Sequence, residues 1–577
     1  MALRDRFSSR ALALAAVAAS FSLAGQALAD GPVKVFIMMG QSNMVGLGNV
    51  TGNTDGTLDY AVNTEGLYPY LSDGNGGFAS RSDVRQAHVQ GSGGPGANTS
   101  LLVNDWLSGD NRNKLGPELG IGEMLGNAID QPVLLLKSVI GNRSLGWDLL
   151  PPGSTQYPFN DNGTDYTYAG YGDSPERWVT GTTPQPVNWQ AGLQYDGDVA
   201  RAKNVLAEFE TYYPGQTEYE VAGFFWWQGD KDRYNAGHAA RYEQNLVRLV
   251  EQLRVEFDAP NAPFVAATLG QSEIGVETGT ELQILNAQLA IDGDTGSYPL
   301  FKDNTSTVYS YPLSLGGASN SHYNGNAKTY MNIGEAMGAA MVDLLENSPY
   351  VEVDRQTGEV KIVVPATASG DLDLRDYALG SAAGALVGSG WDPIAGNYDA
   401  AGDGSVDSGL WSVLTNSVTE LSESAVPGGA DGLIAAGSEV SLGAGVWLQN
   451  AIEDITFTYT DTGDLPRSLQ VRYVGNRAGL GDLDFDGSVT AADWVIFISN
   501  AQADMSGLTA AQTAQAGDLD GDGDNDIYDF ALFREAYEAD NPAPGAFEAM
   551  VASTSVPEPG SLAVLGLGGL GLLRRRG

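Results

Sequence analysis

A serine ends a short turn near the start of the chain, in the stretch "MMGQSNMVG" at residues 38–46. The stretch completes an apolar run, and a strand that ends in a tight turn can expose a serine nucleophile at the carboxyl edge of a sheet, where α/β proteins form ligand sites. The other interpretation is that Ser42 only caps the helix that follows it. The chemistry of Ser42 therefore depends on whether a base and hydrogen-bond donors reach the same edge.

Histidine is the usual base for a serine nucleophile, and the chain has three histidines. His322 lies in the polar stretch "SNSHYNGNAK", which leads into a helix near the end of the first domain. A loop in that place can carry a base to the sheet edge. His238 lies within a helical run, where we expect it at the surface, and His88 lies in a glycine-rich loop region. We therefore predict that His322 is the base.

Two other apolar runs end next to groups that could bind an oxyanion. The run at residues 132–140 is followed by Gly141, which would bring a backbone N–H to the edge. The run at residues 221–227 is followed by Gln228, whose side-chain amide can donate a hydrogen bond there. A nucleophile, a base and two donors then come from four separate parts of the chain, which is difficult to explain by packing alone.

The elements that must position these groups are four apolar runs typical of buried parallel strands, at residues 33–39, 132–140, 221–227 and 263–270. Helical patterns lie between them. Alternating strands and helices predict an α/β domain with helices on both faces of the sheet, over residues 30–347.

The same blocks resemble the SGNH hydrolases, in their sialate O-acetylesterase and acetylxylan esterase-like branch. "GQSNM" is similar to the nucleophile block and "WWQGDKD" to the W-x-Q-G-[ED] block, while "KSVIGNRSL" and "SHYNGNAKTY" stand where the glycine and histidine blocks should be. The resemblance covers most of residues 33–345. It implies a doubly wound, flavodoxin-like parallel sheet and removal of acetyl groups from carbohydrate through an acetyl-enzyme, with no metal in the chemistry. We place Gln41, Asn142 and Arg143 at the substrate, and expect Trp147, Trp226 or Trp227 to shape the sugar site, although a tryptophan in a strand is more often core.

The third member of the catalytic set is open. The family usually has an aspartate three residues before the histidine, and here that position is Ser319. Asp230 and Asp303 are the substitutes that the sequence offers, and we include Asp230 among the catalytic residues. A backbone carbonyl could also orient the imidazole, which would leave a Ser–His dyad.

The two ends of the chain predict export. Residues 1–29 have a basic start, an apolar core and a small-x-small site, which is typical of a signal peptide. Residues 556–577 join Pro-Glu-Pro to an apolar run and three arginines. This order resembles the PEP-CTERM sorting tail, which implies recognition by an exosortase and a secreted or cell-envelope protein of a Gram-negative-type bacterium.

Two acidic loops share one register, "GDLDFDGSVTAADW" from Gly481 and "GDLDGDGDNDIYDF" from Gly517. Oxygen ligands at alternating positions, a central glycine and a closing carboxylate are the spacing of a calcium loop. The pair resembles the dockerin family over residues 481–540, which implies folding coupled to calcium and a possible docking partner. The expected ligands are Asp482, Asp484, Asp486, Ser488 and Asp493 in the first loop, and Asp518, Asp520, Asp522, Asp524 and Asp529 in the second.

Composition limits the remaining possibilities. The formal net charge of −42 argues against nucleic-acid binding, and the absence of cysteine excludes disulfides and thiolate metal sites. Short β-like runs over residues 350–476 predict a β-sandwich-like accessory domain, and residues 542–555 look like a linker. An alternative function is a non-catalytic carbohydrate-binding or surface structural protein, anchored by the calcium module and the sorting tail.

Overall fold

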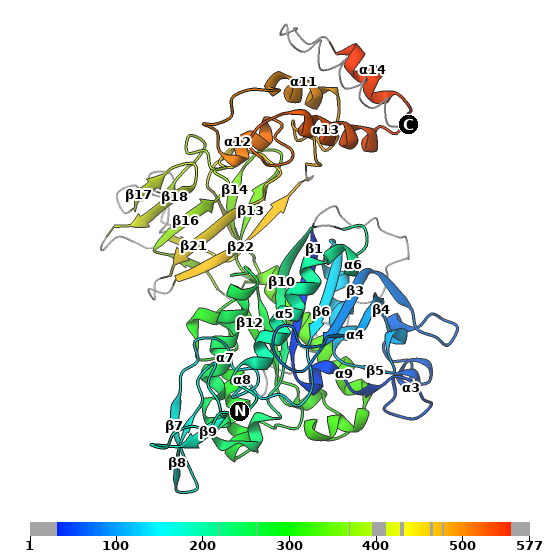
Figure 1. The fold of residues 1–577 in the computed structure, drawn as a ribbon, viewed down its shortest axis with the longest axis vertical. Coiled ribbons are helices and arrows are strands. Elements are labelled where there is room, and N and C mark those ends of the chain that lie inside the picture. The colour runs from blue at the N-terminus through cyan, green and yellow to red at the C-terminus, as the bar shows by residue number, and fades with distance from the viewer. Residues whose placement is uncertain are drawn as a thin grey trace.

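The computed structural model describes residues 32–216, 218–260, 262–368, 370–394, 411–426, 432–461, 466–475 and 478–554. The expected signal peptide and sorting tail lie outside the described residues. The described chain forms an α/β domain, a β domain and a helical module, one after another (Figure 1). Among the described helices, none is both long and apolar enough to cross a membrane.

The first domain is built on a seven-stranded sheet in which the first six strands in spatial order run parallel and the last is antiparallel to its neighbour. Two helical layers cover this sheet, as the parallel arrangement requires. The strands in spatial order are β12 (Thr305–Val308), β11 (Phe264–Ala267), β10 (Tyr219–Trp227), β1 (Val33–Gly40), β6 (Val133–Ser138), β3 (Ser80–Gln90) and β4 (Ser100–Ser108).

Alternate residues of β1 face two different cores, because successive side chains of a strand point to opposite faces. Phe36 and Met38 belong to the core under α4 (Glu118–Ala128) and α9 (Ala327–Asn347). Val35 and Ile37 belong to the core on the opposite face, under α5 (Leu193–Ala207), α7 (Ala236–Glu256) and α8 (Gly279–Ala290). The expected α/β layout, with helices on both faces, is therefore the one observed.

The strand order reverses between β1 and β10. From β1 the chain goes to β3, β4 and β6 on one side, and then to β10, β11 and β12 on the other. A crevice forms at such a switch point, outside the carboxyl ends of the two strands, and it is the usual ligand site of this architecture. Both Ser42 and Gln228 follow strands that end there.

The first domain also contains smaller elements outside the seven-stranded sheet and its two helical layers. A three-stranded antiparallel arm, β7 to β9, projects from the domain on the side away from the β domain (Figure 1). These elements are α2 (Ser42–Val45), β2 (Gly48–Asn49), α3 (Leu58–Asn63), β5 (Lys114–Leu115), β7 (Tyr157–Asp161), β8 (Thr164–Tyr168), β9 (Arg177–Val179) and α6 (Phe209–Tyr212), with short 3-10 turns at Pro69–Leu71, Gly109–Asn111, Asp232–Tyr234, Pro299–Phe301, Tyr311–Leu313 and Ser319–Gly325.

The second domain has one continuous eight-stranded sheet in place of the two packed sheets of the sandwich that we expected. Strand β13 joins its two halves, because it pairs antiparallel with β14 and parallel with β22. The strand order is β17 (Trp411–Asn416), β18 (Glu420–Ala425), β16 (Asp376–Ser381), β21 (Ile455–Thr460), β22 (Pro466–Val474), β13 (Tyr350–Asp354), β14 (Val360–Val364) and β20 (Ser438–Ser441), with β15 (Leu372–Leu374) and β19 (Gly432–Ile434) paired separately.

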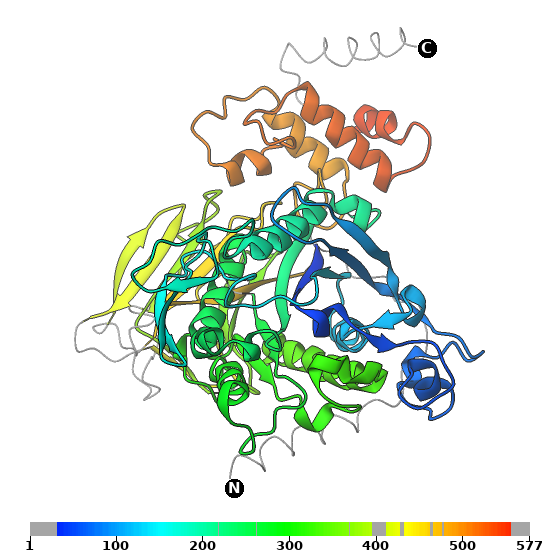
Figure 2. The same cartoon turned by 60° about the horizontal axis from the view of Figure 1, so that its bottom comes forward.

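The third unit is a group of four helices, α11 (Ala491–Asn500), α12 (Ala510–Gln515), α13 (Ile527–Asp540) and α14 (Ala546–Ser553), which lie together in Figure 2. Helix α14 occupies the segment that we expected to be a linker. Its Phe547 and Met550 are buried in the same core as Trp494 and Phe533, so two large apolar side chains make this segment part of the module.

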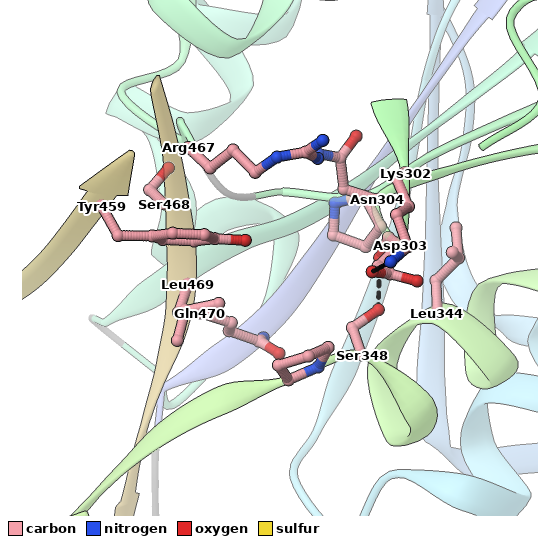
Figure 3. A pocket seen from close by; sticks show the side chains of 12 residues that line it. Lys302, Asp303, Asn304, Leu344, Ser348, Tyr459, Arg467, Ser468, Leu469 and Gln470 are labelled. Carbon is pink, nitrogen blue, oxygen red and sulfur yellow. Dashed lines mark hydrogen bonds and ion pairs between the residues drawn. The ribbon is translucent and has the colours of Figure 1, made fainter. Parts of the chain in front are cut away.

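A cleft lies between the first two domains, at the amino ends of the parallel strands of the seven-stranded sheet (Figure 3). Lys302 and Asp303 line it from the first domain, and Tyr459 and Arg467 line it from the second. The Ser348 hydroxyl, just after α9, donates to the backbone carbonyl of Asp303. Because Asp303 precedes β12, the second domain is attached at the end of the sheet opposite to Ser42.

Candidate functional site

Ser42 directly follows the turn at the end of β1 and begins the one-turn helix α2. Gln41 is the N-cap, and no side chain caps this helix, so the interpretation of Ser42 as a helix cap is wrong. Gly40 makes the turn possible: its φ is +144°, and a Cβ there would lie 2.5 Å from the carbonyl oxygen of Trp227. Ser42 is partly exposed, as a nucleophile must be.

Gly141 lies against Ser42. A Cβ built on Gly141 would stand 3.4 Å from the Cβ of Ser42, so the backbone of the loop after β6 passes beside the serine. That distance is an ordinary van der Waals contact, so the loop backbone and the serine are in close approach without strain. The structure thus brings together the predicted nucleophile and the predicted backbone donor from two different strands.

A hydrogen bond joins the turn that holds Ser42 to the loop that holds His322. The Asn43 side-chain amide donates to the Tyr323 hydroxyl at 3.2 Å, and both residues are fully buried. Each is the immediate neighbour in sequence of a predicted catalytic residue. Tyr323 also accepts a hydrogen bond from the Gly270 backbone N–H at 3.2 Å, so the base loop is tied to the loop after β11 as well.

His322 is partly exposed and lies in the short turn Ser319–Gly325 with a left-handed backbone, φ 53°. Burial lowers the pKa of this histidine below its usual value, because the charged imidazolium loses water, and the negative charge of Asp230 acts in the opposite direction. The imidazole is therefore mainly neutral near pH 7, which is the form that can accept a proton from a serine.

Asp230 reaches the base loop through Ser319. The Ser319 hydroxyl donates to Asp230 Oδ1 at 2.6 Å, and Arg233 Nε donates to the same oxygen at 2.9 Å. The residue that replaces the aspartate of the resembled family thus holds a carboxylate from the end of β10. Asp303 lies at the other end of the sheet, beside the second domain (Figure 3). Asp230 is therefore the better placed of the two acids to act on His322.

Gln228 is occupied within the protein. Its amide nitrogen carries two hydrogens and contacts three acceptors, Gln41 Oε1 at 3.1 Å, the Arg143 carbonyl at 2.9 Å and Asp232 Oδ2 at 2.6 Å. Its amide oxygen accepts from the Tyr242 hydroxyl at 2.8 Å. This geometry favours a role in positioning the nucleophile turn and the Gly141 loop over the direct oxyanion contact that we predicted.

Of the three residues predicted to contact the substrate, one is buried and two lie at the surface. Gln41 is 2% exposed, and its side-chain oxygen accepts from Gln228 and from the Lys231 backbone N–H, so it faces the protein interior. Asn142 is exposed. Arg143 is partly exposed and lies with its guanidinium 5.3 Å from the ring centre of Trp189. Trp189 was not predicted, because a lone tryptophan in a polar segment belongs to no recognisable pattern.

The tryptophans expected near the sugar are mainly structural. Trp226 and Trp227 are fully buried, one in each core of the sheet. Trp147 is 8% exposed and packs in a small cluster with partly buried Trp178 and Trp189. The aromatic side chain that Arg143 contacts is Trp189, on the segment before α5.

The other two histidines are buried, although we expected His238 at the surface. His238 is 3% exposed in the first turn of α7, with Nε2 3.1 Å from a carboxylate oxygen of Glu176. The β7 to β9 arm packs against this turn and covers it, through Tyr168. His88 lies inside strand β3 and not in a loop; burial and the nearby charges of Lys137 and Arg112 hold its pKa well below the usual value.

The two acidic loops bring carboxylates together as a cation site requires. One oxygen each from Asp482, Asp484 and Asp493 lies within 4.8 Å of the others, and Asp518, Asp520 and Asp529 form a matching group. Asp524 also approaches Asp529, while Asp486, Ser488 and Asp522 are exposed on the loops.

A buried oxygen without a partner fits a cation in the first loop. Asp482 is 3% exposed, and its Oδ1 has no hydrogen-bond partner among the described residues. Burial, together with the charges of Asp493 and Asp486, raises the pKa of Asp482 to about 6. A cation bound to these oxygens would compensate both the lost hydration and the repulsion. The residues present therefore fit the calcium that the spacing predicts.

Comparison with known proteins supports an exported carbohydrate esterase. Residues 172–343 match the family model "Carbohydrate esterase, sialic acid-specific acetylesterase", a span that includes Gln228, Asp230 and His322 but begins after Ser42 and Gly141. Residues 555–576 match the PEP-CTERM protein-sorting motif, which indicates export and sorting to the cell envelope in bacteria.

Solved structures that match include a protein from Arabidopsis thaliana, at 15% identity and TM-score 0.31, covering 54% of this chain and 99% of that chain. The carbohydrate acetylesterase XAC1771 from Xanthomonas citri matches at 13% identity and TM-score 0.35, covering 76% and 79%. NanS matches at 15% identity and TM-score 0.25, covering 45% and 72%. No curated protein sequence gives a significant match.

Replacement of Asp230 tests the third member of the catalytic set. Asp230→Asn should lower kcat by roughly 10³- to 10⁴-fold, as for the loss of a triad acid. Because the Asp230 charge raises the pKa of His322, its removal should also move the acidic limb of the kcat/KM profile to lower pH. The measurement is acetate release as a function of pH. Asp303→Asn is the control and should behave as wild type; an Asp230→Asn profile identical to wild type would favour the dyad.

Proposed function

We propose that the protein is an exported serine esterase that removes O-acetyl groups from carbohydrate, of the sialate O-acetylesterase or acetylxylan esterase type. The observation that carries the proposal is the buried hydrogen bond between Asn43 and Tyr323, which joins the nucleophile turn to the base loop at the switch point of the sheet. Gly141 beside Ser42 completes the arrangement. The family match to residues 172–343 and the sorting motif at residues 555–576 support the same conclusion.

In the proposed first step, Ser42 Oγ attacks the acetyl carbonyl carbon while His322 takes the hydroxyl proton. The carbonyl π electrons move to oxygen, and the backbone N–H groups of Ser42 and Gly141 stabilise that oxyanion. One such donor is commonly worth 10²- to 10³-fold in kcat. The tetrahedral intermediate then collapses, the C–O bond to the sugar breaks, and His322 returns the proton to the sugar oxygen. An acetyl-enzyme on Ser42 remains.

Hydrolysis of the acetyl-enzyme repeats the same proton movements with water in place of the sugar. His322 takes a proton from water as the water oxygen attacks, and returns it to Ser42 Oγ as acetate leaves. In both steps the imidazole becomes positively charged. The negative charge of the Asp230 carboxylate, which Ser319 holds, stabilises the imidazolium through space.

The substrate is a sugar that packs against Trp189 and Arg143. An aromatic face suits the C–H face of a sugar ring, and the guanidinium donates to sugar oxygens. Arg143 is already oriented for this role, because its Nε donates to Gln194 at 3.1 Å and its Nη2 donates to Ser92 at 2.7 Å. Exposed Asn142, between Gly141 and Arg143, supplies a further polar contact to the substrate.

The helical module binds two calcium ions in this proposal, one in each acidic loop. Calcium is structural, since the loops belong to a different unit from Ser42 and the chemistry uses no metal. The dockerin resemblance implies a docking partner for this module. The tail at residues 556–577 is the signal for an exosortase of a Gram-negative-type bacterium.

Loss of either catalytic side chain should abolish turnover. Ser42→Ala removes the nucleophile and His322→Ala removes the base, so each should lower release of acetate from acetylated glycans and p-nitrophenyl acetate to the background rate. Ser321→Ala is a matched control, since this exposed serine is in the same loop as His322 and bonds only to the Ala318 carbonyl among the described contacts. Mass spectrometry of the wild type quenched during turnover should find one acetyl group on Ser42. Wild-type rates in Ser42→Ala would rule out the assignment, and a complete lack of turnover in the wild type would favour the non-catalytic binding function.

The contact between Arg143 and Trp189 predicts a substrate-dependent effect. Trp189→Ala should raise KM for acetylated oligosaccharides about 5- to 10-fold, the loss expected for one aromatic contact of about 1 kcal/mol. Turnover of p-nitrophenyl acetate, which has no sugar, should not change. Trp178→Ala, in the same small cluster, is the control for packing. An equal loss on both substrates would show that Trp189 supports the fold and not the sugar.

Calcium binding is testable on the whole chain after treatment with a chelator. Calorimetry should count two sites in the wild type and one in Asp482→Ala, because that variant removes a buried ligand of the first loop. Asp504→Ala is the matched control, an exposed acid between the loops whose carboxylate binds the Ser506 N–H. Esterase activity should persist in chelator. Absence of calcium uptake by the wild type would contradict the proposal for this module.

A further inference from the structure

A buried carboxylate lies next to the proposed catalytic groups without being one of them. Asp232 is fully buried in the turn Asp232–Tyr234, which follows β10. Its Oδ2 accepts hydrogen bonds from the Leu145 N–H at 2.9 Å and from the Gln228 amide at 2.6 Å. Its Oδ1 accepts from the Gly146 N–H at 2.7 Å. Three donors therefore converge on one carboxylate.

These donors belong to the segments that carry the proposed oxyanion site. Leu145 and Gly146 lie in the loop after β6, the same loop in which Gly141 passes beside Ser42. The Gln228 amide also contacts the side chain of Gln41, the residue before Ser42, at 3.1 Å. One carboxylate thus joins the nucleophile turn, the Gly141 loop and the end of β10.

His238 supports this carboxylate from the other side. Its Nδ1 is 3.8 Å from Asp232 Oδ1, and its Nε2 is 3.1 Å from Glu176. Gly146 packs directly on the imidazole, since a Cβ at Gly146 would stand 2.4 Å from His238 Cγ. The loop backbone is therefore held between the carboxylate that accepts its N–H groups and the ring on which it rests.

We propose that Asp232 is a positioning residue that fixes the backbone N–H of Gly141 relative to Ser42, and so sets the geometry of the oxyanion site. The proposal rests on the esterase function above. Gly141 and Ser42 lie just after two different strands, β6 and β1, and the distance between them is not set by either strand alone. Asp232 supplies the missing constraint, because it binds the Gly141 loop directly and the Ser42 turn through Gln228 and Gln41.

The sensitive variant is Asp232→Asn, which keeps the shape of the side chain. An asparagine has one acceptor oxygen and one NH2 group, so at least one of the three donors would face another donor. The loop must then shift. A displacement of about 1 Å at a catalytic group costs on the order of 10²-fold in rate. The effect should fall on kcat, because the oxyanion contact is made only in the transition state.

Two readouts separate positioning from simple loss of fold. Titration of Ser42 with a fluorophosphonate counts the molecules that have a reactive serine, so kcat is expressed per reactive site. The acidic limb of the pH profile reports His322, and it should stay in place in Asp232→Asn while it moves in Asp230→Asn. A protein that is only partly folded would show fewer reactive sites at an unchanged kcat for each site.

Gly146→Ala is a second variant that leaves the carboxylate intact and pushes the same loop away from His238. It should show the same loss of kcat per reactive site with little change in KM. Asp292→Asn is the matched control: Asp292 is 8% exposed and accepts backbone N–H groups of Thr295 and Thr307, but it lies beside the edge strand β12. It should keep the wild-type kcat per site.

The experiment is p-nitrophenyl acetate turnover by these full-length variants, with the titration and the pH profile. A fall of roughly 10- to 100-fold in kcat per reactive site for Asp232→Asn and Gly146→Ala, with wild-type values for Asp292→Asn, supports the proposal. Wild-type kcat per site in Asp232→Asn overturns it while leaving the esterase function standing. A wild-type protein that hydrolyses no acetyl ester overturns the proposed function, and this inference with it.

Discussion

The site depends on the close approach of β1 to β10 at the point where both strands end. Gly40 pairs with Trp227 in the parallel register, and a Cβ on Gly40 would lie 2.5 Å from the Trp227 carbonyl oxygen. Only glycine fits there without moving a backbone. Because β1 and β10 end side by side, Ser42 follows one strand and Gln228 follows the other at the same edge of the sheet. Every hydrogen bond described between the nucleophile turn and the segment after β10 follows from this contact.

Buried charges then hold the loops around this point. Asp232 binds the loop after β6 from one side. Lys137 is fully buried and pairs with Glu118 at 2.7 Å. It also donates at 3.1 Å to the carbonyl of Val45, the last residue of α2. A buried ion pair is a weak source of stability, because the loss of hydration offsets most of the attraction, but breaking one is costly. Such groups are therefore better suited to fix one arrangement of the backbone than to strengthen the fold, and an oxyanion site needs one arrangement.

The sequence predicted the features that depend on periodicity and strand ends. Apolar runs located four of the six parallel strands, β1, β6, β10 and β11, but not β3 or β12, which are not continuous apolar runs. The rule that parallel strands end at one edge brought Ser42, Gly141 and Gln228 together. It did not predict what each polar side chain would bind, because hydrogen-bond partners come from parts of the chain far apart. Gln228 is therefore occupied by Asp232 and not free to donate, and His238 is buried under an arm that its own helical pattern does not reveal. The eight-stranded sheet of the second domain was missed for the same reason, since strand pairing is not visible in the alternation of single strands.

The direction of α9 determines at which end of the first domain the later domains are attached. Helix α9 runs back across the sheet, and Ser348 at its end contacts Asp303 at the amino edge (Figure 3). The β domain must begin there, and the helical module follows it, anchored by the Ala511 N–H to the Ala383 carbonyl at 3.0 Å. Both units are therefore added at the end of the first domain opposite to Ser42, and the arm from β7 to β9 projects on the other side (Figure 1). A chain that is held through its C-terminal units would therefore keep the carboxyl edge of the sheet, and Ser42 with it, facing away from the point of attachment.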